Sequence, residues 1–229
     1  MKRLILSLLF ALVVMSAGAQ TGTVKTFSIL GDSYSTFQGH VPEGNAIWYS
    51  AVPNGENDVT KVEQTWWYLF GESGKYRMIM NDSYSGSTIC NTGYDRADYT
   101  DRSFITRMKR LVEGGEAPDI LFIFGATNDS WADAPIGELQ YGDWTSTDLY
   151  RCLPAYCHML DYLTSVLPQT KIVCVINSEL KYEIVDGIMK ASDHYGTSYI
   201  LLKDIEKIWG HPSILGMRQI CDQLTGFLD

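Results

Sequence analysis

One pattern recurs along the chain and constrains its fold more than any other feature. An apolar, β-branched run is followed by a small polar turn and then by a segment with helical periodicity. The runs are nearly continuous rather than alternating, which is typical of strands buried on both faces of a parallel sheet. Five runs have the length and composition of strands: residues 25–30, 76–80, 119–124, 171–176 and 198–202.

Helical segments separate and follow these runs. Thr147 and Asp148 are expected to cap the third helix, and Pro168 is expected to end it. Strands that alternate with helices form a parallel sheet covered on both faces. We therefore expect the α/β class, as a three-layer α/β/α sandwich with a five-stranded parallel sheet. The expected helices span residues 64–70, 103–112, 147–167, 181–194 and 213–227.

Composition and charge narrow the classes of function. The 229 residues are 45% hydrophobic, which suits one domain with a full core. The formal net charge is −9 and the basic residues are scattered, so the chain would repel a phosphate backbone, and nucleic acid is not an expected partner. The five cysteines lack zinc-type spacing, and we expect no metal and no other cofactor.

The N-terminal residues have the pattern of an export signal. Lys2 and Arg3 precede a short apolar run, and Ala17-Gly18-Ala19 offers a signal-peptidase site. We expect a signal peptide at 1–19, a mature domain at 20–229, and a periplasmic or extracellular location. An uncleaved membrane anchor is the alternative, although the run is short for a bilayer span.

Small polar clusters follow three of the strand candidates, and a fourth precedes the last helix. Chemistry in α/β sheets lies beyond the carboxyl ends of the strands. A hydrolytic serine needs a hydroxyl, an imidazole base and donors for an oxyanion. Ser33, on a Gly-led turn, can supply the hydroxyl. His211 can supply the base, because it alone among four histidines follows a Gly and precedes a Pro; His40 is a weaker candidate, for substrate contact.

Oxyanion donors are available from the same clusters. The backbone N–H groups of Ser33 and Gly86 and the side-chain amide of Asn128 can supply three. Taken singly, each cluster is more often a turn or a helix cap than a catalytic element. Their order, and the position of each at a strand end, favour a site.

The clusters resemble the four blocks of the SGNH (GDSL-type) hydrolase superfamily across essentially the whole mature chain. The matching segments, in order, are Gly31-Asp32-Ser33, Asn81 through Gly86, Asn128-Asp129 and His211-Pro212. The resemblance implies a flavodoxin-like SGNH-hydrolase fold, with Ser33 as nucleophile and His211 as base. It also implies an oxyanion hole of Ser33, Gly86 and Asn128. Asp32 and Asp129 are expected to support the turns rather than to react.

Two positions depart from the family pattern. Ala126 stands where the third block usually has glycine, and its β-carbon is expected to crowd the backbone slightly. Ile208 stands where an Asp three residues before the histidine usually orients the imidazole. The sequence therefore does not identify the group that orients the His211 imidazole. The candidates are Asp204, Glu206, Glu179 or a backbone carbonyl within residues 208–210.

Aromatic residues point to the class of substrate. Trp48, Trp131, Trp144 and Trp209 fall in segments expected to rim the cleft, and such rings stack on sugars. We expect a secreted serine esterase that acts on small-acyl esters, foremost O-acetyl, on carbohydrate. The rings could equally pin long loops onto the body of the protein.

Two other readings of the sequence remain. A catalytically impaired, glycan-binding member of the same fold is the main alternative, and Ile208 motivates it. A flavodoxin-like cofactor binder would need a phosphate-binding loop, and no glycine-rich motif of that kind occurs.

Overall fold

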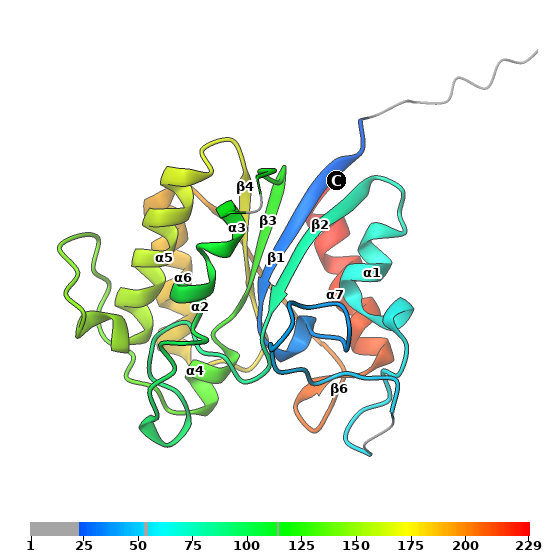
Figure 1. The fold of residues 1–229 in the computed structure, drawn as a ribbon, viewed down its shortest axis with the longest axis horizontal. Helices are drawn as coiled ribbons and strands as arrows, with labels where there is room; N and C mark the ends of the chain where they lie inside the picture. Colours follow the sequence, from blue (N-terminus) through cyan, green and yellow to red (C-terminus); the bar gives the residue numbers. More distant parts are fainter. Residues whose placement is uncertain (1–22, 53–54, 114) are drawn as a thin grey trace, which may run out of the picture.

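Five parallel strands form the centre of the protein, in the spatial order β2-β1-β3-β4-β5 (Figure 1). The computed structural model describes residues 23–52, 55–113 and 115–229, so the expected signal peptide at 1–19 lies outside the described residues. The strands are β1 (Lys25–Gly31), β2 (Tyr76–Ser83), β3 (Ile120–Gly125), β4 (Lys171–Ile176) and β5 (Ser198–Leu201).

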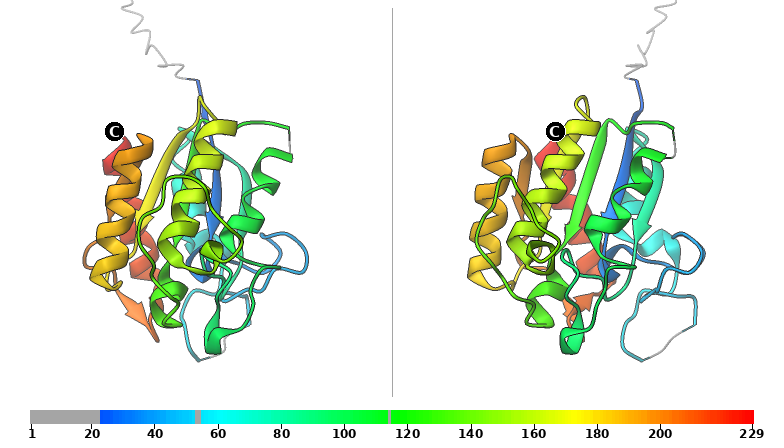
Figure 2. Two further views of the ribbon diagram at one scale, coloured as in Figure 1. Left: turned by 90° about the vertical axis from the view of Figure 1, so that its left-hand side faces the viewer. Right: turned by 60° about the vertical axis from the view of Figure 1, so that its left-hand side comes forward.

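Helices cover both faces of the sheet, and the views in Figures 1 and 2 separate the two layers. The expected three-layer α/β/α sandwich is therefore confirmed. One layer holds α1 (Trp66–Gly71) and α7 (Ile214–Leu228). The other holds α2 (Phe104–Arg107), α3 (Arg110–Glu113), α5 (Cys152–Val166) and α6 (Tyr182–Tyr195).

The sheet separates two apolar cores, and β3 shows how one strand serves both. Ile120, Phe122 and Phe124 lie in the core beneath α1 and α7, whereas Leu121 and Ile123 lie in the core beneath α5 and α6. Because successive side chains point to opposite faces, a strand covered on both sides must be apolar at every position. This explains the continuous apolar run in the sequence. No helix of the described residues is long and apolar enough to cross a bilayer.

Several boundaries differ from the expected ones. β2 continues to Ser83, three residues beyond its expected end. Thr147 and Asp148 do not cap α5: the Asp148 carboxylate accepts hydrogen bonds from Thr145, and residues 148–150 form a separate short turn, η4 (Asp148–Tyr150). Arg151 is then extended, so α5 begins only at Cys152. The expected helix at 103–112 is two short helices, α2 and α3.

The segment before α7 forms a small hairpin that the sequence did not predict. Its strands are β6 (Lys207–Ile208) and β7 (His211–Pro212), paired antiparallel. His211 therefore lies on a strand rather than at a helix start. Ser213 caps α7 by accepting a hydrogen bond from Gly216 N–H at 3.1 Å. The carboxyl ends of β1–β5 and this hairpin lie at the same edge, the lower one in Figure 1.

Gly216 tests how tightly the hairpin is seated on α7. Alanine usually stabilises a helix interior by about 1 kcal/mol relative to glycine. At Gly216, however, a β-carbon would overlap the Glu206 carbonyl oxygen. We expect Gly216→Ala to lower the free energy of unfolding by about 2 kcal/mol, the ordinary cost of overpacking, as measured by urea denaturation.

The matched control lies in the same helix. A β-carbon at Gly226 meets no atom within 4 Å, so Gly226→Ala should raise the free energy of unfolding by about 0.5–1 kcal/mol. Equal stability of the two variants would contradict the close packing of α7 on the hairpin.

Candidate active site

Ser33 begins a short turn, η1 (Ser33–Ser35), directly after β1. The Asp32 carboxylate caps this turn by accepting a hydrogen bond from Tyr34 N–H at 3.0 Å. The Asp32 N–H donates to the Phe124 carbonyl at the end of β3, 3.2 Å away. The turn is thus fixed to the neighbouring strand, and only 2% of Ser33 is exposed.

His211 reaches the serine from the hairpin. Its Nε2 lies 2.9 Å from Ser33 Oγ, a hydrogen-bond distance between residues 178 positions apart in the sequence. Two buried tyrosines hold the backbone on either side of the histidine. The Tyr34 hydroxyl donates to the Gly210 carbonyl at 2.5 Å, and the Tyr49 hydroxyl donates to the Pro212 carbonyl at 2.8 Å. The hydroxyl and the imidazole are therefore placed for proton transfer.

The other imidazole nitrogen faces a backbone oxygen. His211 Nδ1 lies 3.2 Å from the Trp209 carbonyl, which belongs to the 208–210 segment named among the candidates. Two carboxylates from the same set of candidates have other partners: Glu206 accepts from Ser213 Oγ, and Glu179 pairs with Lys207. With Nδ1 donating to the carbonyl, Nε2 is left as the acceptor for the serine proton.

Each of the three expected oxyanion donors has a hydrogen that is still available. Asn128, in α4 (Thr127–Trp131), donates from Nδ2 to the Ser87 carbonyl at 3.0 Å, and one hydrogen of its amide remains. The Tyr94 hydroxyl donates to Asn128 Oδ1 at 2.9 Å, which fixes the orientation of the amide. Within the described residues, the N–H groups of Ser33 and Gly86 donate to no backbone acceptor. These three groups can serve as oxyanion donors.

Gly86 has a conformational reason to be glycine. Its φ of 82° lies in the left-handed region, which other residues adopt only at a cost. Ala126 is in the same region, with φ 69° and ψ −4°. The β-carbon at this departure from the family pattern therefore costs free energy through the backbone conformation, about 1 kcal/mol.

Arg107 joins the segments of the site, and sequence reasoning missed it. Its fully buried guanidinium donates to the Gly31 carbonyl at 3.0 Å and to Ser87 Oγ at 3.0 Å, and it pairs with the Asp82 carboxylate at 3.2 Å. One signal was available: Phe104, Arg107, Met108 and Leu111 share one helical face, which places the arginine on a buried side.

Two buried carboxyl groups support the turns. Asp129 accepts from the N–H of Ile89 at 2.7 Å and of Cys90 at 3.3 Å. Burial raises the pKa of Asp129. It also raises the pKa of Asp32 to about 7, although the hydrogen bond from Tyr34 N–H and, to a smaller extent, the charge of Arg107 oppose that shift. Both side chains bond to backbone groups, so their contacts are those of supporting residues.

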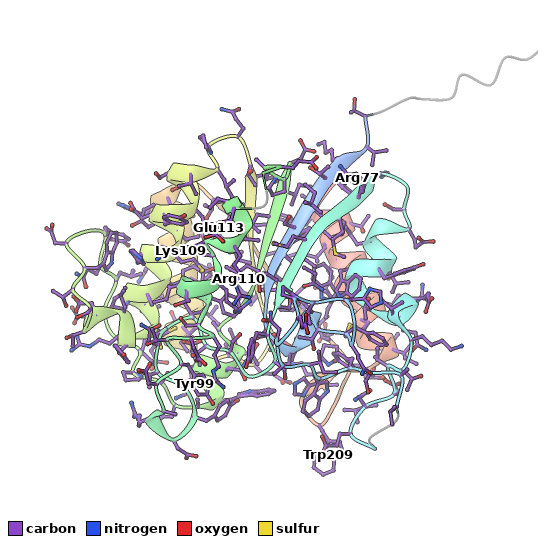
Figure 3. The ribbon with its side chains drawn as sticks, viewed as in Figure 1. Arg77, Tyr99, Lys109, Arg110, Glu113 and Trp209 are labelled. Atoms are coloured by element: carbon purple, nitrogen blue, oxygen red, sulfur yellow. The ribbon has the colours of Figure 1, made fainter. Side chains whose placement is uncertain are left out.

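Aromatic rings enclose the histidine and extend beyond it. The Trp48 ring lies parallel to the imidazole, and the Trp131 ring meets it edge-on. Trp209 is 77% exposed and projects outward at the hairpin (Figure 3). Trp144 is not part of this group, because its ring packs on His158 in α5. Three of the four expected tryptophans thus lie around the site.

The remaining candidates have other surroundings. His40 packs against Phe37 and Trp67. His194 stacks on Tyr141, 3.8 Å between ring centroids. In residues 23–52, 55–113 and 115–229, no group of three or more His, Cys, Asp or Glu side chains is arranged to hold a metal ion.

Comparison with known proteins identifies similar sequences and folds. The model of the GDSL-like lipase/acylhydrolase family matches residues 25–228. A protein from Bacteroides ovatus, whose solved structure is described as a GDSL-like lipase, is 49% identical, with a TM-score of 0.86 over 90% of this chain and 99% of its own. A counterpart from Bacteroides uniformis is 52% identical, with a TM-score of 0.84 over 89% and 95%.

A more distant structure shares the fold. An acetyl xylan esterase from the rumen bacterium Butyrivibrio proteoclasticus is 14% identical, with a TM-score of 0.56 over 89% of this chain and 63% of its own. Among curated proteins, none matches this chain.

The reactivity of Ser33 should decrease at a lower pH than the ordinary pKa of histidine would give. Burial lowers the pKa of His211 to about 4; the Trp209 carbonyl opposes this shift and the charge of Lys207 adds to it. The imidazole must be neutral to accept the serine proton. We therefore expect the rate at which a fluorophosphonate probe labels Ser33 to fall below about pH 5, with a midpoint near the His211 pKa.

The control is His211→Ala, in which this acidic limb should disappear together with most of the labelling. A midpoint of the labelling rate at pH 6 or above would contradict the lowering of the His211 pKa by burial.

Proposed function

The chain belongs to the GDSL-like lipase/acylhydrolase family, a family of ester-hydrolysing enzymes, and we propose that it is a secreted serine esterase for small acyl groups on carbohydrate. The observation that carries the serine mechanism is the 2.9 Å contact between Ser33 Oγ and His211 Nε2. It joins the first and last of the four sequence blocks at one edge of the sheet.

The proposed reaction proceeds in two stages. Ser33 Oγ attacks the ester carbonyl while its proton passes to His211 Nε2, and the resulting oxyanion accepts hydrogen bonds from Ser33 N–H, Gly86 N–H and Asn128 Nδ2. The imidazolium then protonates the leaving alcohol, and an acyl-enzyme remains. Water gives a proton to His211 and attacks the acyl carbon. The bond from that carbon to Ser33 Oγ then breaks, the acid leaves, and His211 returns its proton to Ser33 Oγ.

The proposal of a small acyl group rests on burial. Ser33 is 2% exposed and His211 is 5% exposed, although both must contact the ester. The Trp48 and Trp131 rings pack around the imidazole and further restrict the access of an ester to His211. An acetyl group fits such restricted access better than a long acyl chain does.

The proposal of a carbohydrate alcohol rests on the exposed rings beside the histidine. Trp209 is 77% exposed and Trp131 is 42% exposed, although both side chains are large and apolar. Flat aromatic faces that remain in water next to a nucleophile are suited to stacking on sugar rings. The acetyl xylan esterase that shares the fold is named for a substrate of this class.

Secretion is part of the same proposal. The basic and apolar pattern of residues 1–19 supports export, and a polysaccharide ester is a substrate that an exported enzyme can reach. The test is whether protein expressed from the full sequence reaches the periplasm or medium with Gln20 as its N-terminal residue.

Hydrolysis of p-nitrophenyl acetate tests the esterase. Ser33→Ala and His211→Ala should each lower kcat/KM at least about a thousandfold, because nucleophile and base act as a unit. His194→Ala is the matched control: this histidine stacks on Tyr141, and its replacement should leave the rate unchanged. If the wild-type protein binds acetylated glycan but hydrolyses neither that glycan nor p-nitrophenyl acetate, the glycan-binding alternative is supported instead.

Trp209→Ala tests the carbohydrate part separately. The loss of one stacking surface should raise KM for acetylated xylan about tenfold, with little change for p-nitrophenyl acetate. Phe227→Ala removes an exposed ring that packs near Lys171 at the opposite edge of the sheet, and it should change neither value. Equal effects of Trp209→Ala on both substrates would argue against sugar stacking.

A further inference from the structure

The imidazole of His211 lacks the partner that usually fixes such a ring. Position 208 is Ile, and no carboxylate of the described residues bonds to either ring nitrogen. The Trp209 carbonyl, 3.2 Å from Nδ1, is a neutral acceptor, and hydrogen bonds of that kind are weaker than those to a carboxylate. A single bond of this length leaves the tilt of the ring plane to other contacts.

Trp48 supplies the most extensive of those contacts. Its ring centroid lies 3.7 Å from that of the imidazole, and the two planes differ by 9°. The other rings around the histidine meet it at steep angles: 58° for Tyr34, 75° for Trp131 and 82° for Tyr49. Trp48 is therefore the one face-to-face neighbour among the described residues.

The position of Trp48 is tied to that of the nucleophile. Its backbone N–H donates to Thr36 Oγ1 at 2.9 Å, and that hydroxyl donates to the Ser33 carbonyl at 3.0 Å. The indole is not held by its own N–H, because Nε1 is buried without a partner in the described part of the chain. A buried indole N–H usually finds an acceptor. The ring is thus placed by its backbone bond and by the stack on His211.

We propose that Trp48 is the positioning residue of the base: its indole face fixes the imidazole plane and stabilises the imidazolium, two tasks that a triad carboxylate performs in related hydrolases. This inference rests on the proposed esterase function. When the Ser33 proton moves to Nε2, the ring becomes a cation that faces the electron-rich surface of the indole, and such a contact is attractive. The proton and the charge stay on His211 until the leaving group takes the proton.

The charged groups near His211 do not stabilise its imidazolium form. Lys207, on β6, is the charged side chain that acts on the ring, and its positive charge disfavours an imidazolium. Its Nζ is 2.8 Å from the Glu179 carboxylate, which therefore pairs with Lys207. The rings of Tyr34 and Tyr49 carry hydroxyls that donate to backbone carbonyls. None of these groups supplies a negative charge to the base.

Three variants separate stacking from simple packing. Trp48→Phe keeps an aromatic face, whereas Trp48→Leu keeps apolar volume without one. With p-nitrophenyl acetate, Trp48→Leu should lower kcat about tenfold with KM within about twofold, and Trp48→Phe should restore kcat to within about threefold of wild type. Trp144→Leu makes the same replacement beside His158 on α5, and its kcat should equal that of wild type.

The ring itself gives a second readout that does not need turnover. In protein labelled with ¹⁵N-histidine, His211 of wild type and of Trp48→Phe should give the two separate nitrogen shifts of a neutral ring protonated at Nδ1. Trp48→Leu should move the two shifts toward each other, because a ring that leaves the Trp209 carbonyl exchanges its proton between Nδ1 and Nε2. Circular dichroism at the assay temperature establishes that each variant is folded.

The outcomes distinguish this proposal from the one on which it rests. If wild type hydrolyses no ester, the esterase proposal fails, and the nitrogen shifts alone decide the role of Trp48. If Trp48→Leu keeps wild-type kcat and shifts, or if Trp48→Phe is as impaired as Trp48→Leu, stacking does not position the base and the proposal is overturned.

Discussion

Arg107 carries a positive charge into the interior, where its side chain has no exposed surface and burial lowers its pKa to about 10. A buried charge costs several kcal/mol unless its donors are bonded and an opposite charge is close. Gly31, Asp82 and Ser87 supply those partners from the ends of β1 and β2 and from the turn after β2. These segments cannot separate without leaving the guanidinium unpaired. Because Ser33 follows Gly31 by two residues and Gly86 precedes Ser87, the same bonds hold Ser33 and the turn at Gly86 in fixed relation.

The base is held by a different kind of interaction. Its hairpin has only two short strands, and its backbone is fixed from outside by the hydroxyls of Tyr34 and Tyr49. A carboxylate bonded to the imidazole would keep its pKa high. Without one, burial dominates and the imidazole stays neutral over most of the physiological range. A neutral imidazole is ready to accept a proton, but the cation that it forms needs stabilisation, which the surrounding rings must supply.

The sequence predicted the layers of the fold well because burial on both faces leaves a strong signal. In β3 every position is buried, so its apolar run is continuous, and the same is true of most of β4. The polar clusters at strand ends could be found for a related reason, since small polar residues interrupt apolar runs. Arg107 was missed because a charged residue within a helix is ordinarily exposed. The β6–β7 hairpin was missed because strands of two residues have no periodicity. The stack of Trp48 on His211 joins this hairpin to the long segment after η1.

The features that the sequence predicted and those that it missed come from different parts of the site: the former follow the strands of the sheet, and the latter lie mainly outside it. The proposed nucleophile and oxyanion donors follow β1, β2 and β3, which pair in parallel. The base and its stacked partner Trp48 come from the hairpin and from the long segment after η1, neither of which belongs to the five-stranded sheet. Loops can change composition without disturbing the register of the strands. A loop residue near the histidine is therefore easier to exchange than Ser33, Gly86 or Asn128, which lie just after the ends of β1, β2 and β3.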